Sequence, residues 1–550
     1  YLALELLGSQ RDFLCNREHF FLFCQQKADI PCRRKQLAVH IAFCGEYCGL
    51  LSFGLRYCKA FGKKPYEWVI PGSSPSNRGY DSYGSLCGRG KCSNSRGDGA
   101  FYYIQFYRAE VFCIYKNGKG ERIICPPFSE VRTKQSGNFT GRMEIEVVME
   151  KVKYLILGAG PAGLSFANCL KQKGEESFLL LEKEAEAGGL CRSADVDGAP
   201  LDIGGGHFLD VQRQEVNRFL FGFMPEEEWN RYERDSRISF DGGYIGHPFE
   251  ANIWQMAPGR QREYLESIAN AGCNRGEKKP EEFIDWIYWK LGKRIAEDYM
   301  LPYNEKMFGR DLNALGTYWL EKLPNVSYEE TQKSCEERRA YGKQPGHARF
   351  YYPKKYGYGE LWHRMREALS DKAVMNAKVR KMDALRGQIV CSDGSVYEGE
   401  KIITTIPWAE WEEIAGMPEE LWQDLKKLKH SATQIEYVPE RMDTAAHWIY
   451  YPEKEVSYHR ILVRHNFCPG GKGYWTETNK ERVEADRGRF RYMNEYAYPL
   501  NTVDKPRIMK TLLGWAKERQ IYGLGRWGEH AHYNSDVVVE LAMDLVQKLG

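Results

Sequence analysis

The sequence has 550 residues, of which 43% are hydrophobic and 28% are charged, and 78 basic and 75 acidic side chains leave a formal net charge of +3. This composition is typical of a globular chain with more than one domain, and it excludes a wholly disordered or fibrous protein. The near balance of charge argues against a nucleic-acid-binding protein. The best apolar stretch, residues 41–55, contains Glu46 and three glycines, so we expect no membrane span.

The first 150 residues differ from the rest in charge and in cysteine content. They hold 21 lysines and arginines, 14 acidic residues and ten of the 16 cysteines. The cysteines lack the paired spacing of a zinc site, and residues 72–99 are rich in glycine and serine, which disfavours a packed core. We expect residues 1–148 to be either a non-native or disordered leader or a small basic accessory domain. Met149 has the context of an enzyme start, no signal peptide is apparent, and we expect a cytoplasmic protein.

A nucleotide-binding pattern begins after this segment. Residues 152–157 form an apolar run of strand length, GAGPAG follows, and residues 164–170 have helical spacing. A strand, a GxGxxG turn and a helix are the context that a dinucleotide-binding loop requires. Gly158 would allow the tight turn, Gly160 would let the backbone approach a pyrophosphate, and Gly163 would allow close packing of helix on strand. The N–H groups at the helix N-terminus would then face the phosphates.

A second predicted strand, residues 177–181, ends in Glu182. Glu182 lies 24 residues after Gly158, near the distance at which an acidic side chain binds the ribose hydroxyls. An acidic residue here favours an unphosphorylated ribose.

Two more glycine runs follow, GGLCR at residues 188–192 and LDIGGGHF at residues 201–208. The stretch 154–207 resembles the FAD-binding front of the amine oxidase superfamily, which includes protoporphyrinogen oxidases, phytoene desaturases and UDP-galactopyranose mutases. The resemblance implies a noncovalently bound FAD, with its phosphates along residues 188–192 and its flavin ring beside residues 204–207. Glycines would let backbone N–H groups reach the flat ring without steric conflict.

The C-terminal residues carry a complementary pattern. The sequence predicts helices over residues 505–518 and 537–549, with Ser535 or Asp536 as the cap of the second, and a strand at 521–525 between them. The resemblance implies that the N-terminus of the last helix faces the flavin, where its dipole would stabilise negative charge on the reduced ring.

The resemblance covers about residues 152–549. It implies that Val379, at the end of a predicted strand 373–379, lies against the adenine, and that residues 401–407 form a strand returning to the nucleotide domain. The cofactor-binding residues that it implies are Gly158, Gly160, Pro161, Ala162, Gly163, Glu182, Lys183, Gly188, Gly189, Arg192, Gly205, Gly206, His207, Val379, Gly525, Arg526, Ser535 and Asp536.

The substrate side would come from residues 208–350 and 430–500. Arg349 begins the run RFYYPKKY, whose cations and aromatic faces suit an anionic ligand; the alternative is a solvated basic loop over an aromatic core. His207 is placed for proton transfer at neutral pH, or it only hydrogen-bonds its loop. Our candidate catalytic residues are His207, Arg349, His532 and Tyr498, and the sequence has no metal-site signature.

Residues 299–309, 474–479 and 494–500 and the Gly525-Arg526 turn are similar to the mutase branch of the superfamily, with two departures. The stretch 425–431 has no arginine where the mutases carry one for the substrate diphosphate, and His532 stands where they carry a tyrosine. These departures weaken the prediction of a sugar-nucleotide substrate.

We therefore expect an α/β, two-domain FAD-binding fold: a doubly wound, Rossmann-like parallel sheet from residues 149–215, 365–430 and 505–550, with a mixed α+β substrate domain from residues 216–364 and 431–504. The predicted function is that of an FAD-dependent oxidoreductase in which the flavin accepts hydride from a small anionic substrate. The alternatives are a mutase-like isomerase of sugar nucleotides that uses reduced FAD, and a non-catalytic flavin-binding protein. We expect no nucleic-acid partner.

Overall fold

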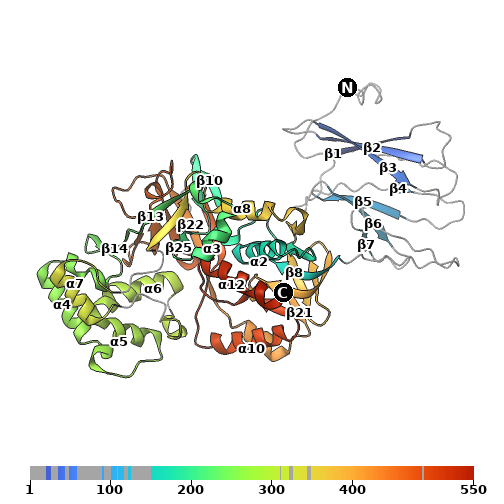
Figure 1. Ribbon diagram of the computed structural model, residues 1–550. Helices are drawn as coiled ribbons and strands as arrows, with labels where there is room; N and C mark the ends of the chain where they lie inside the picture. Colours follow the sequence, from blue (N-terminus) through green and yellow to red (C-terminus); the bar gives the residue numbers. More distant parts are fainter. Residues whose placement is uncertain are drawn as a thin grey trace, which may run out of the picture. The chain divides into compact units, whose positions relative to one another are not determined.

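The computed structural model describes residues 150–550 except 310, 321–325, 343–347 and 486–487, together with seven strands before residue 150 (Figure 1). Its contacts divide the chain into two compact units, Tyr1–Glu146 and Val147–Gly550.

The described part of the first unit consists of strands. Three form one antiparallel sheet and four form another. Met149 and most of the stretch 72–99, for which we predicted no packed core, lie outside the described residues. The strands are β1 (Phe20–Gln26), β2 (Lys35–Phe43), β3 (Gly49–Tyr57), β4 (Gly90–Lys91), β5 (Phe101–Tyr107), β6 (Glu110–Lys116) and β7 (Arg122–Cys125).

The second unit is built around a sheet with a parallel centre. The order β17-β9-β8-β20 is parallel throughout, and β27 adds a further parallel strand beside β20. β19 pairs with the start of β20 on the same edge as β27, and β18 and β21 extend the sheet from there with antiparallel and parallel pairs. The strands are β8 (Glu150–Leu157), β9 (Phe178–Leu181), β17 (Ala373–Val374), β18 (Val379–Asp383), β19 (Gln388–Cys391), β20 (Val396–Thr404), β21 (Glu413–Ala415) and β27 (Ile521–Gly523).

Helices cover both faces of this sheet (Figure 1). Successive side chains of β8 point to opposite faces, so Tyr154 and Ile156 join a core with α2 and α12, while Leu155 and Leu157 join a second core with α9 and α10. All four are at most 1% exposed, as expected of a parallel strand buried on both sides. The helices are α2 (Pro161–Gln172), α8 (Gly359–Glu367), α9 (Glu419–Leu425), α10 (Lys505–Lys517) and α12 (Ser535–Leu549).

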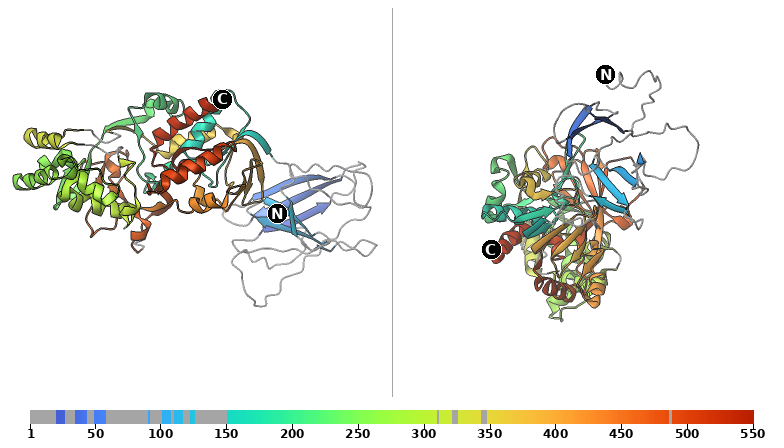
Figure 2. Two further views of the ribbon diagram at one scale, coloured as in Figure 1. Left: turned by 90° about the horizontal axis from the view of Figure 1, so that it is seen from below. Right: turned by 90° about the vertical axis from the view of Figure 1, so that its right-hand side faces the viewer.

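The remaining elements form a mixed α+β domain. Its seven-stranded sheet has the order β15-β14-β23-β24-β25-β22-β26, and a smaller sheet has the order β12-β16-β13. Figure 2 shows α4, α5 and α7 clustered at the end of the unit away from α2 and α12. The elements are the hairpin β10 (Ser193–Val196) and β11 (Ala199–Asp202), β12 (Leu209–Asp210), α3 (Gln214–Phe221), β13 (Trp229–Glu233), β14 (Ser236–Phe240), β15 (Gly243–Gly246), α4 (Pro258–Ala269), α5 (Phe283–Ile295), α6 (Leu301–Phe308), α7 (Tyr328–Glu337), β16 (Arg349–Pro353), β22 (His430–Val438), β23 (Trp448–Tyr450), β24 (Arg460–Leu462), β25 (Tyr474–Asn479) and β26 (Arg491–Pro499). The short helix α11 (Gly525–Gly528) instead contacts β27 and α12.

The structure confirms the predicted fold class, a doubly wound sheet with a mixed second domain, while the boundaries of the two domains stay predictions. Two local expectations were wrong. The strand expected over 373–379 is broken, because Asn376 has a φ of 61° and Ala377 turns to donate to the Glu182 carbonyl. Helix α12 begins at Ser535, so its N-cap is Asn534 rather than Ser535 or Asp536. Among the described residues, no helix combines the length and the apolar character needed to cross a bilayer.

Candidate functional site

The glycine-rich turn after β8 has three glycines with three different surroundings. Gly158 has a φ of +101°, and a Cβ there would lie 2.5 Å from Thr405 Oγ1. A Cβ on Gly163 would lie 2.0 Å from the carbonyl oxygen of Gly158. The local packing therefore requires both glycines. A Cβ on Gly160 would meet nothing within 4 Å, so its backbone faces open space at the N-terminus of α2, which begins with Pro161, as a phosphate-binding turn should.

Glu182, the residue after β9, hydrogen-bonds to this turn. It is 8% exposed, and its carboxylate accepts hydrogen bonds from the backbone N–H groups of Ala159 (2.6 Å) and Glu184 (3.0 Å). Burial raises the pKa of this carboxyl. Each carboxylate oxygen has a second acceptor site, so a ribose hydroxyl can still bind. Lys183 instead pairs with Glu410 at the surface.

The loop 188–192 packs against this glycine-rich turn. The N–H of Gly188 donates to the carbonyl of Ala159 at 2.7 Å, and a Cβ on Gly189 would lie 3.3 Å from Gly160 Cα. The Arg192 guanidinium donates to the Gly189 carbonyl and to the Tyr492 hydroxyl. The loop 188–192 and the turn 158–163 therefore lie against each other.

The glycine turn at Gly525, near the C-terminus, also lies against the start of α2. Gly525 has a φ of +76°, and a Cβ there would lie 2.8 Å from the Cβ of Ala162 in α2. This close approach brings the two ends of the sequence pattern together. Val379 is also near, since it starts β18 two residues after Ala377, whose N–H donates to the Glu182 carbonyl.

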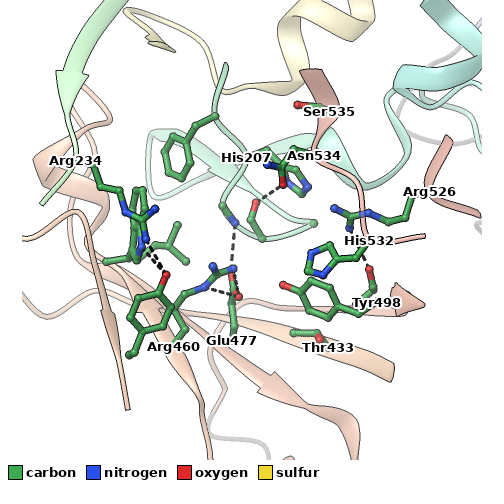
Figure 3. Close-up of a pocket in the computed structure, with 18 residues that line it drawn as sticks. His207, Arg234, Thr433, Arg460, Glu477, Tyr498, Arg526, His532, Asn534 and Ser535 are labelled. Carbon is green, nitrogen blue, oxygen red and sulfur yellow. Dashed lines mark hydrogen bonds and ion pairs between the residues drawn. The ribbon is translucent and has the colours of Figure 1, made fainter. Parts of the chain in front are cut away.

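A cavity of about 160 Å³ opens beside residues 204–207 (Figure 3). Its residues come from the glycine loop, from strands of the seven-stranded sheet and from the start of α12. The labelled residues in Figure 3 are His207, Arg234, Thr433, Arg460, Glu477, Tyr498, Arg526, His532, Asn534 and Ser535.

Glu477 is the carboxylate of this cavity, and it is 1% exposed. It accepts hydrogen bonds from Arg460 Nε at 2.9 Å and Nη2 at 2.5 Å, and from the backbone N–H of Gly206 at 3.2 Å. His459 Nε2 lies 3.6 Å away. Burial opposes ionisation, but the Arg460 guanidinium and His459 outweigh it and hold the pKa of Glu477 at about 2. Glu477 thus stays ionised and fixes Arg460 beside the glycine loop.

His207 is neutral in this setting. Burial and the Arg526 guanidinium lower its pKa to about 4. Its Nδ1 lies 2.9 Å from the carbonyl oxygen of Gly205. A carbonyl only accepts, so Nδ1 carries the hydrogen and Nε2 is left as an acceptor. The ring stacks on Tyr358 with centroids 6.3 Å apart.

Two more arginines line the cavity. Arg526 donates to the carbonyls of Ala497 and Tyr533 and lies over the Tyr498 ring, 5.8 Å from its centroid. Arg234 lies 4.6 Å from the Trp448 ring centroid. Three arginines and one carboxylate, that of Glu477, thus line the cavity.

The start of α12 closes the remaining side. Asn534 and Ser535 line the cavity, so the positive end of the helix dipole faces it. Asp536 is 2% exposed and pairs with Arg213 at 2.5 Å. It therefore brings no uncompensated negative charge to the helix end.

The structure brings three of the four predicted catalytic residues together, but not Arg349. His207, Tyr498, His532, Arg526 and Ser535 line one cavity, whereas Arg349 is exposed and lines a separate one. We therefore do not place Arg349 in this site.

Sequence reasoning missed Arg234, Arg460, Glu477 and Thr433. They lie on β25, β24, β22 or next to β14 and meet only through the pairing of the sheet. No sequence motif identifies these residues. The one available signal was that Glu477 and Arg460 are charged residues within strands, where a buried charge is unusual.

Residues 161–440, just over half of the chain, match the family described as flavin containing amine oxidoreductase. The fold is similar to that of a reduced UDP-galactopyranose mutase, with a TM-score of 0.66 and 22% identity over 72% of this chain and 93% of that chain. It is also similar to a putative protoporphyrinogen oxidase from Exiguobacterium sp. 255-15, with a TM-score of 0.53 and 12% identity over 74% of this chain and 99% of that chain. At these identities the likeness is one of fold.

A curated relative matches a shorter stretch. All-trans-retinol 13,14-reductase from Rattus norvegicus is 25% identical over 191 residues, which are 33% of this chain and 28% of that protein. The chain thus spans about a quarter of the length of this relative.

Proposed function

The chain belongs to the flavin containing amine oxidoreductase family, and on this premise we propose that it is an FAD-dependent oxidoreductase that acts on a small anionic substrate. The observation that carries the proposal is the position of the arginine-lined cavity, which lies directly beside the glycine loop 204–207. A hydride donor bound there would sit next to the predicted position of the flavin ring.

The residues present fit an FAD. The open side of Gly160 offers the space that a pyrophosphate needs, and the N-terminus of α2 offers the charge. Glu182 would bind the ribose, and the segment near Arg192 would follow the phosphates. When bound, the flavin would supply hydride acceptance. We propose that the attachment is noncovalent.

Arginines would bind and orient the substrate. Arg234 and Arg460 line the same cavity, and Glu477 fixes Arg460 in place through two hydrogen bonds. A carboxylate or phosphate group would be held by charge-assisted bonds. The surplus of positive charge disfavours a cationic substrate, so an anionic one is favoured over a simple amine.

His207 would accept the proton that leaves when the substrate is oxidised. Its neutral imidazole has Nε2 available as an acceptor, because Nδ1 is bound to the Gly205 carbonyl. Only an unprotonated imidazole can accept a proton, and the lowered pKa keeps His207 unprotonated at pH 7. Tyr498 and His532, whose ring centroids are 5.0 Å apart, would form the opposite wall.

A mutase-like isomerisation of a sugar nucleotide is the second candidate. It is favoured by the aromatic wall of Trp448, Tyr450 and Tyr498 beside the arginines, since aromatic faces suit a sugar ring and arginines suit a diphosphate. A non-catalytic flavin-binding protein is a further alternative. It predicts that no substrate changes the flavin spectrum.

One experiment separates these functions. The purified holoprotein is mixed without oxygen with anionic amines, hydroxy acids and UDP-sugars, and the flavin absorption is followed. Bleaching by an anionic amine or alcohol supports the oxidoreductase. Conversion of UDP-galactopyranose to its furanose isomer by the dithionite-reduced protein, without net bleaching, would instead establish the mutase.

A further inference from the structure

A second cavity, of about 950 Å³, lies on the outer side of the small sheet β12-β16-β13. It is lined by β13, β16 and α3 and by the loops next to them, and it shares no lining residue with the cavity beside His207. Arg231 and Arg349 lie on its wall.

The alternation of strand β16 places Arg349 in this cavity. Phe350 and Tyr352 are fully buried on the inner face, where the Phe350 ring packs 4.5 Å from that of Phe208. Successive side chains point to opposite faces, so Arg349 and Tyr351 point outward. The cation that the sequence singled out for anion binding is therefore directed away from the cavity beside His207.

The register of the strands brings a second arginine close. Arg231 is opposite Tyr351 in the antiparallel pair, and Glu233 is opposite Arg349. Arg231 and Arg349 are thus diagonal neighbours on one face, a relationship in which residues lie about 7–8 Å apart. Two side chains of this length can hold one oxyanion between their guanidinium groups.

Neither arginine forms an ion pair within the described part of the chain, although Glu226 and Glu227 also line the cavity and Glu233 is opposite Arg349. By contrast, Arg213 pairs with Asp536 and Arg364 with Glu228. Glu226 on the same wall accepts a hydrogen bond from the Tyr351 hydroxyl at 2.7 Å.

A buried amide adds a second feature that points to a ligand. Asn217 is 5% exposed and lines the cavity. Its NH2 group donates to the carbonyls of Asp210 and Val211, which fixes the orientation of the amide, and its oxygen has no hydrogen-bond partner in the described residues. This oxygen lacks a donor, and a ligand hydroxyl group would supply one.

We propose that this cavity binds a phosphorylated, hydroxyl-bearing small molecule, with the phosphate between Arg231 and Arg349. The site does not depend on the flavin chemistry proposed above. Phe350 and Tyr352 belong to the same strand as Arg349, and the Tyr352 hydroxyl donates to Asp202 at 3.1 Å, just before the glycine loop. The ligand would therefore bind directly behind the candidate active site.

The test uses the full-length, flavin-loaded protein and calorimetric titration with glucose 6-phosphate, AMP and inorganic phosphate. We expect Arg231→Ala and Arg349→Ala each to weaken binding about ten- to a hundred-fold. Glu233→Gln removes a carboxylate beside the anion, so it should tighten binding. Arg275→Ala, an exposed arginine outside both cavities, is the matched control and should change nothing.

The variant Arg460→Lys distinguishes phosphate binding at the cavity beside His207 from binding at the cavity lined by Arg231 and Arg349. Binding that survives Arg460→Lys and is lost in Arg349→Ala supports the proposal. Glucose 6-phosphate or AMP binding more tightly than inorganic phosphate assigns the hydroxyl-bearing ligand, and equal affinities overturn that part. No binding at millimolar concentration, or binding that Arg231→Ala and Arg349→Ala leave unchanged, overturns the whole proposal.

Discussion

The hydroxyl of Tyr358 lies 2.8 Å from that of Ser535, while the Tyr358 ring stacks on the imidazole of His207. Its backbone N–H donates to the Asp202 carboxylate at 3.1 Å. Tyr358, whose side chain is fully buried, therefore joins the first residue of α12 and the histidine of the candidate site through its side chain, and the strand that leads to the glycine loop through its backbone.

Tyr358→Phe keeps the ring and removes the bond to Ser535. We expect the free energy of unfolding to fall by about 0.5–1.5 kcal/mol, the contribution of one hydrogen bond. We expect kcat to fall about tenfold with KM unchanged, because small misplacements of groups next to the reaction are costly. Urea unfolding and steady-state kinetics measure both. Ser535→Ala should give the same losses, and fully additive losses in the double variant would contradict this relationship.

Gly160→Val places a side chain in the open space at the start of α2, where we propose the pyrophosphate. Beyond the residue itself and its chain neighbours, nothing lies within 4 Å of the added Cβ, so the protein should fold. We expect it to be purified without flavin, as measured by its absorption spectrum. Gly259→Val is the control, since a Cβ there also meets nothing within 4 Å. A Gly160→Val protein with a full flavin spectrum would show that the cofactor lies elsewhere.

The contiguous part of the site could be predicted from the sequence. The glycine spacing at 158–163 and Glu182 after the next strand are local features, and local sequence determines a strand, a turn and a helix. The charged wall could not be predicted, because Arg460 and Glu477 meet only through the register of β24 on β25. The sequence indicated that Arg349 could bind an anion. It could not indicate which cavity the side chain faces, because that depends on which face of β16 is buried.

His207 should contribute to the loss of the protein's stability in acid. Its pKa is about 4 in the folded protein, lowered by burial and by Arg526, against about 6.5 in an unfolded chain. Below pH 6.5 the unfolded chain therefore binds a proton that the folded protein does not. The stability that His207 contributes is full above pH 6.5 and is lost as the pH falls towards 4. Urea unfolding between pH 4.5 and 7.5 should show a flatter profile for His207→Gln than for the unmodified protein.

Asp202 should contribute to the pH dependence of stability in the opposite direction. Burial raises its pKa to about 6, so its carboxyl stabilises the fold at low pH and loses that contribution as the pH rises from about 3.9 to about 6. Asp202→Asn should therefore cost less stability at pH 7 than at pH 4.5. Equal costs at both values would mean that the carboxyl is not protonated in the folded protein.

A chain that starts at Met149 should fold and bind flavin. The unit Val147–Gly550 makes its own internal contacts, and β8 begins at Glu150. We expect the shortened protein to have the same flavin content and the same melting temperature for this unit as the full chain. A shortened protein that is insoluble or colourless would show that residues 1–148 are needed.

The arginines of the two cavities should have separate effects on catalysis. Arg460→Ala would leave Glu477 buried and unpaired, which is strongly destabilising. Arg460→Lys avoids this, because it keeps the charge and loses the two-pronged geometry. We expect Arg460→Lys and Arg234→Ala to raise KM for an anionic substrate about ten- to a hundred-fold, the effect of one charge-assisted contact, with the flavin spectrum unchanged. Arg349→Ala is the matched control in the second cavity and should leave KM unchanged. If Arg349→Ala raised KM as much as Arg460→Lys does, the substrate would bind at the run RFYYPKKY and not beside residues 204–207.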